Sequence, residues 1–78
     1  KTAYKITQLN QWGEFCCEFG TFESKEVAIE EMFKGLSKLY KGFKKEVWLD
    51  ENSGQWHCEK YDFIIDISIS DFNKFGEV

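Results

Sequence analysis

The sequence contains no arginine and no proline, and all ten of its permanently cationic residues are lysines. Arginine is the residue that most often makes bidentate contacts with phosphate, carboxylate and guanine. A protein that reads a DNA or RNA sequence would rarely lack it, so we expect no direct nucleic-acid binding of that kind. The lysine-only, proline-free composition is compatible with an AT-rich genome.

Long apolar runs and glycine-rich loops are also missing. The longest apolar candidate, FIIDISIS, alternates with polar residues and contains Asp66, whereas a membrane-spanning helix needs roughly 20 apolar residues. Glycine loops for phosphate and the motifs that surround a catalytic nucleophile are absent. We therefore expect no membrane segment, no cofactor and no enzymatic activity.

Aromatic and acidic residues are abundant in the 78 residues. The chain has eight phenylalanines, three tryptophans and three tyrosines, and its fourteen acidic residues give a net charge of −4. This aromatic content argues against disorder, and the length suits one domain with one core. Three cysteines leave one thiol over after any disulfide, which favours a reducing, cytoplasmic location.

Hydrophobic periodicity predicts the element order ββαβββ. Alternating residues predict strands over 3–9, 14–19, 44–50, 55–60 and 62–72. Helical spacing predicts one amphipathic helix over 25–41. We expect an α+β fold in which residues 1–78 form a single domain, with this helix packed on one face of an antiparallel sheet and residues 73–78 as a frayed tail.

The predicted helix has clear end signals. Ser24 is a suitable N-cap and Gly42 a suitable stop. Its apolar stripe consists of Ile29, Met32, Phe33, Leu36 and Tyr40. Gly35 lies on the flank of this stripe, where we expect it to allow close contact with a strand.

The adjacent cysteines of EFCCEFG are separated by the strand pattern. Neighbouring residues of a strand point to opposite faces, so we expect Cys17 in the core with Phe15 and Phe19. Cys16 is then expected on the opposite face of the sheet, which has no helix and is called the open face, beside Glu14 and Glu18.

The neighbouring residues His57 and Cys58 are expected on opposite faces for the same reason. A turn at ENSG pairs Asp50 with Gln55, which places Trp48 beside His57 on the open face and directs Cys58 inward. Three thiols and one imidazole then cannot converge, so we expect no metal site. Cys17 and Cys58 are left as buried thiols or, alternatively, as a disulfide.

The open face is the predicted functional surface. The candidate partner-binding residues are Glu14, Cys16, Glu18, Glu46, Trp48, His57 and Glu59. Aromatic residues among carboxylates are typical of an interaction patch for a basic protein, although charges on a solvated sheet face also prevent aggregation. Both interpretations remain open at this point.

Two other functions remain as alternatives. Lys34, Lys38, Lys41, Lys44 and Lys45 lie on or just after the predicted helix and could contact phosphates, although lysines near a helix C-terminus also complement its dipole. Cys16 with His57 as its base could form a small thiol enzyme or redox site.

In size, charge and predicted architecture, the chain is similar to small acidic accessory proteins of phages and mobile elements. These include inhibitors of bacterial defence systems, among them anti-CRISPR proteins. No motif and no individual residue carries this similarity. From the acidic, aromatic-bearing face we expect a non-catalytic binding module or inhibitor that docks this face, or an exposed strand edge, on a basic partner. If that partner binds nucleic acid, the carboxylates stand in for phosphates.

Overall fold

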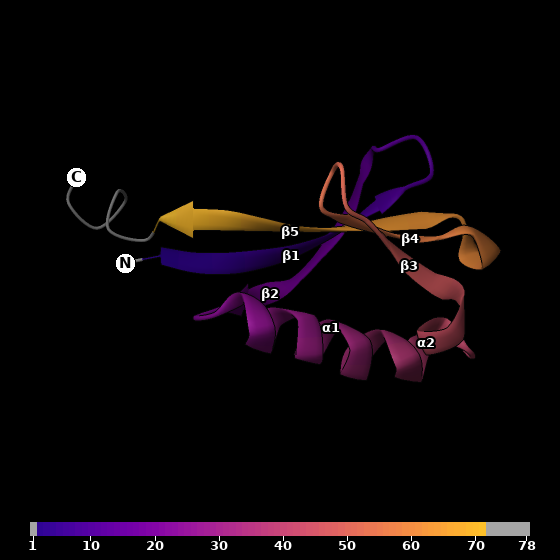
Figure 1. Ribbon diagram of the computed structural model, residues 1–78, viewed down its shortest axis with the longest axis horizontal. Coiled ribbons are helices and arrows are strands. Elements are labelled where there is room, and N and C mark those ends of the chain that lie inside the picture. Colours follow the sequence, from indigo (N-terminus) through magenta and orange to yellow (C-terminus); the bar gives the residue numbers. More distant parts are fainter. Residues whose placement is uncertain (1, 72–78) are drawn as a thin grey trace.

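The computed structural model describes residues 2–71, which form a five-stranded antiparallel sheet with one long helix on one face (Figure 1). The elements are β1 (Thr2–Asn10), β2 (Phe15–Phe22), α1 (Lys25–Leu39), α2 (Phe43–Glu46), β3 (Val47–Asp50), β4 (Gln55–Cys58), a 3₁₀ turn (Glu59–Tyr61) and β5 (Phe63–Asp71). The predicted α+β fold and ββαβββ order are confirmed. The tail predicted at 73–78 lies outside the described residues.

The strands lie in the order β2-β1-β5-β4-β3. The first and last strands therefore pair at the centre of the sheet, from Thr2 opposite Asp71 to Asn10 opposite Phe63. The predicted register of the β3–β4 hairpin is confirmed, because Asp50 pairs with Gln55. Within residues 2–71, no helix is long and apolar enough to span a bilayer.

Helix α1 covers one face of the sheet. The backbone N–H of Val27 donates to Ser24 Oγ at 3.2 Å, which confirms the predicted N-cap. Ala28, Met32 and Leu36 are buried against the sheet. The close contact with a strand expected for Gly35 is absent: a Cβ built on it would meet no atom within 4 Å, because Gly35 faces a hollow of about 180 Å³ whose lining also includes Phe19 and Phe22 of β2.

A short helix replaces the beginning of the predicted strand over 44–50. Gly42 adopts φ 79°, a left-handed conformation that glycine accepts without strain, and the chain then makes the turn α2. This turn buries Phe43 completely, with its ring stacked against Phe63 at a centroid distance of 5.9 Å. The strand β3 therefore begins only at Val47.

The pairing of β1 with β2 contains two irregularities, which change the faces predicted for β2. Cys17 pairs with Gln8 and Phe15 with Leu9, so Cys16 is an extra residue between them. Phe19 is extra at the second irregularity. An inserted residue ends the strict alternation of faces.

The prediction that Phe15, Cys17 and Phe19 share the core is therefore wrong. Phe15 is 64% exposed and pairs with Leu9 on the open face, and Phe19 is 37% exposed. Cys17 lies opposite Gln8 at the sheet edge, where it is exposed and its thiol donates to Gln8 Oε1 at 3.6 Å. Cys58 is fully buried, as predicted.

Candidate functional site

One face of the sheet carries neither helix. Figure 1 shows α1 and α2 on the same side, whereas the loops of the two hairpins, residues 11–14 and 51–54, rise on the other side. We call this second side the open face. Residues paired directly across neighbouring strands have their side chains on the same face, so the strand registers define which side chains it presents.

An apolar row crosses all five strands of the open face. It consists of the apolar residues Trp48, Ile64, Leu9 and Phe15 together with His57, whose ring stacks on Trp48, one residue from each strand. Trp48 is 46% exposed and Phe15 is 64% exposed, at the two ends of the row. Neighbouring strands lie about 4.8 Å apart, so the row is about 19 Å long.

A polar row runs beside the apolar one, two residues away on each strand except β2, where the extra residue Cys16 makes the separation three. It consists of Asp50, Gln55, Asp66, Thr7 and Glu18. Gln55 Nε2 donates to Asp66 Oδ1 at 3.3 Å, which joins β4 to β5. Lys5 Nζ lies 3.4 Å from Glu18 Oε1. Three carboxylates therefore alternate with neutral side chains along this row.

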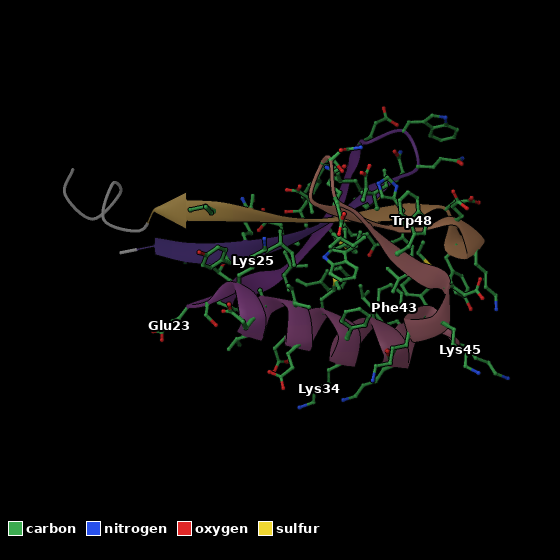
Figure 2. All side chains as sticks on the ribbon, viewed as in Figure 1. Glu23, Lys25, Lys34, Phe43, Lys45 and Trp48 are labelled. Atoms are coloured by element: carbon green, nitrogen blue, oxygen red, sulfur yellow. The ribbon has the colours of Figure 1, made fainter. Side chains whose placement is uncertain are left out.

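The two rows are in contact at one end, where His57 of the apolar row lies between Trp48 of the same row and Asp50 of the polar row. The Trp48 and His57 rings are stacked at a centroid distance of 4.6 Å and an interplanar angle of 16°, and Trp48 lies on β3 (Figure 2). His57 Nε2 is buried 3.7 Å from Asp50 Oδ2, with no hydrogen-bond partner in the described part of the chain. The N–H of Asn52, with smaller contributions from Ser53 and His57, lowers the pKa of Asp50, so its charge is retained at neutral pH.

Two carboxylates line a hollow that His57 also lines. The hollow has a volume of about 230 Å³, and its lining includes Gln11, Glu59 and Asp62. Glu59 belongs to the 3₁₀ turn after β4 and not to the predicted strand over 55–60. It nevertheless lines the same hollow as His57, at the end of the open face.

The loop of the first hairpin is held by one side chain. Asn10 Oδ1 accepts the backbone N–H groups of Trp12 and Glu14, both at 2.9 Å, and Asn10 Nδ2 donates to Glu14 Oε1 at 2.8 Å. Trp12 is 77% exposed at the tip of this loop. The network fixes the loop and with it the position of a large aromatic group beside the open face.

The structure brings together only part of the predicted set of site residues. Glu18, Trp48 and His57 lie in the two rows. Glu14 lies at the hairpin tip, and Cys16 is exposed at the irregularity of β2. Glu46 is the last residue of α2, so the strand position predicted for it is wrong.

Sequence reasoning missed Phe15 as a residue of this surface. The strict alternation that placed it in the core fails at Cys16, and the sequence gives no signal for an extra residue there. Asp50 was also missed, although the sequence did contain a signal for it. Its pairing with Gln55 already placed it two residues from Trp48 on the same strand, and therefore on the same face.

The Cys16 and Cys17 thiols are too far from the His57 imidazole to act with it. Cys16 and Cys17 belong to β2, which is three strand spacings, or about 14 Å, from the β4 residues His57 and Cys58. A nucleophile and its base must lie within hydrogen-bond reach, and a disulfide needs Cα atoms within about 7 Å. Burial raises the pKa of the Cys58 thiol. In residues 2–71, no cluster of three or more His, Cys, Asp or Glu side chains can hold a metal.

The lysines of α1, of α2 and of the turn between them lie on the other side of the molecule. Lys34, Lys38, Lys41, Lys44 and Lys45 are all exposed. Figure 2 shows Lys34 and Lys45 pointing away from the sheet. Glu30 and Glu31 are exposed on the same helix as Lys34, so the positive charge is mixed with negative charge there.

Comparison with known proteins gives no relative from which a function could be transferred. No protein family matches the chain, and neither a similar curated protein nor a similar solved structure was found.

Proposed function

We propose that this protein is a non-catalytic binding module that docks the open face of its sheet on a protein with a basic surface. The observation that carries the proposal is the pair of adjacent rows, one apolar and one with three carboxylates, on a sheet face without a helix. An aromatic group surrounded by polar neighbours is a common centre of a protein interface.

The two rows contribute in different ways. Burial of Trp48 and Phe15 against a partner removes apolar surface from water and slows dissociation. The carboxylates Asp50, Asp66 and Glu18 attract a basic surface over a longer distance and accelerate association. The net charge of −4 acts in the same direction.

We further propose that the basic partner is a nucleic-acid-binding protein and that this chain inhibits it. The carboxylates of the sheet would bind at the positions on the partner that otherwise bind phosphates. The same acidic face repels nucleic acid itself, which separates this proposal from direct DNA or RNA binding. Inhibitors of bacterial defence systems are among the accessory proteins of phages and mobile elements to which the chain is similar in size, charge and architecture.

Affinity capture with variant baits tests the proposal. The variants are Trp48→Ala, the pair Glu18→Gln with Asp66→Asn, and a control that changes Lys34, Lys38 and Lys41 to Gln. We expect a basic protein from the native cells to bind the wild type and the lysine control, and to bind both open-face variants weakly. Loss of capture in the lysine control alone would contradict the proposal and favour the helix face with its lysines.

A further inference from the structure

We propose that the open face receives a basic amphipathic helix of its partner, lying across the strands. This inference rests on the proposed function and specifies the shape of the partner. It follows from the spacing of the two rows, from the alternation of charge within the polar row, and from the loops that border the face.

The apolar row matches the repeat of an amphipathic helix. Its members follow one another at about 4.8 Å, the distance between strands. Apolar residues at alternating spacings of three and four along a helix follow one another at about 5.2 Å. A helix of about 15 residues therefore places five apolar side chains along the five members of the row.

The polar row matches the same helix in charge. Asp50, Asp66 and Glu18 lie on β3, β5 and β2, which are alternate strands of the sheet. The carboxylates are therefore spaced by about 9.6 Å. Lysines or arginines seven residues apart on a helix are spaced by about 10.5 Å. One basic residue per seven, flanking the apolar stripe, reaches each carboxylate in turn.

The loops favour a narrow partner over a flat one. Residues 11–14 and 51–54 rise on the open side, at opposite ends of the strands that form the rows (Figure 1). A single helix is about 10 Å wide with its side chains, and the rows are separated by two residues, or about 6.7 Å. One helix is thus narrow enough to cover both rows between the loops. A flat protein surface would contact Trp12 on the raised loop before it reached the rows.

Two synthetic peptides of about 15 residues test this inference. The first has leucines at alternating spacings of three and four and a lysine flank. The second contains the same residues in an order without an apolar stripe. Their binding is measured by fluorescence anisotropy against the wild type, Trp48→Ala, Phe15→Ser and the pair Glu18→Gln with Asp66→Asn. The control variant is Leu39→Ala, whose side chain is 66% exposed on α1.

We expect the amphipathic peptide to bind at least about tenfold more tightly than its isomer. We also expect Trp48→Ala and Phe15→Ser to remove most of this preference, and Leu39→Ala to leave it unchanged. If both peptides bind equally and their binding still depends on Glu18 and Asp66, the helix inference is overturned. The proposal of a basic partner is unaffected by that result. Loss of the preference in Leu39→Ala alone would also overturn the inference, and so would binding of neither peptide, whereas the affinity capture described above tests the proposed function separately.

Discussion

At the scale of single residues, Asp50 connects the turn of the second hairpin to the open face. Its Oδ1 accepts the backbone N–H of Asn52 at 3.0 Å, and its Oδ2 faces His57 Nε2 at 3.7 Å. Trp48 stacks on the same imidazole. One carboxylate thus helps to shape the turn and to place the aromatic pair that we propose as the partner's contact.

Asp50 also predicts how stability responds to pH. Its pKa in the folded protein is below the ordinary value of 3.8, so the unfolded chain takes up the proton first. The stabilisation is complete above the ordinary pKa and is lost as the pH falls through the folded one. We expect Asp50→Asn to lower the urea midpoint at pH 7, with the difference from the wild type shrinking in acid. A difference that is constant with pH would contradict this assignment.

The three cysteines should react at very different rates. Cys16 and Cys17 are exposed, whereas Cys58 is fully buried and its burial raises the thiol pKa. Because the thiolate is the reactive form, we expect iodoacetamide to label Cys16 and Cys17 in the native state and Cys58 only after unfolding. Peptide mapping of the labelled protein measures this. Protection of Cys17 would contradict its exposed position beside Gln8.

Gly35 offers a stabilising substitution. It lies within α1, and an added Cβ would meet no atom within 4 Å. Alanine in a helix interior is favoured over glycine by about 1 kcal/mol, so Gly35→Ala should raise the free energy of unfolding by up to about that amount. Urea denaturation provides the measurement. A destabilised variant would show that this side of α1 is not open.

At the scale of elements, the short helix α2 closes the core between α1 and the sheet. Phe43 is fully buried and contacts the rings of Phe33 and Phe63 at centroid distances of 5.7 Å and 5.9 Å. Its position in α2 follows from the left-handed Gly42, which turns the chain before β3 begins.

Phe43→Ala should therefore be among the most damaging substitutions. We expect a loss of about 3–5 kcal/mol in the free energy of unfolding, the usual range for a fully buried phenylalanine. Phe33→Ala should cost less, because Phe33 is only partly buried at the edge of the same cluster. Urea unfolding of both variants gives the comparison. An equal or larger effect of Phe33→Ala would contradict the packing described for α2.

Beyond the order of the elements, the details that were predicted are those fixed by local signals. Ser24 marks the start of α1, and the ENSG turn sets the β3–β4 register, so both were predicted. The insertions at Cys16 and Phe19 depend on how β2 pairs with β1. Pairing between strands is a long-range property, which alternation within one strand does not contain. For this reason Phe15 was assigned to the core, although it lies on the open face.

At the scale of the whole molecule, the sheet has two faces of different character. One face packs against α1 and α2 and forms the core. The other presents the apolar and polar rows between two raised loops. The three tryptophans are distributed over distinct surfaces: Trp48 on the open face, Trp56 on the helix side against Phe33, and Trp12 at the hairpin tip.

The indole N–H resonances of these tryptophans report which face of the sheet binds a partner. In ¹⁵N-labelled protein, each tryptophan gives one such signal, assigned through Trp→Phe variants. The amphipathic basic peptide is then titrated in. We expect the Trp48 resonance to shift most, the Trp12 resonance to shift less and the Trp56 resonance to stay in place. A shift confined to Trp56, with Trp48 unaffected, would place binding on the helix side and contradict the open face as the functional surface.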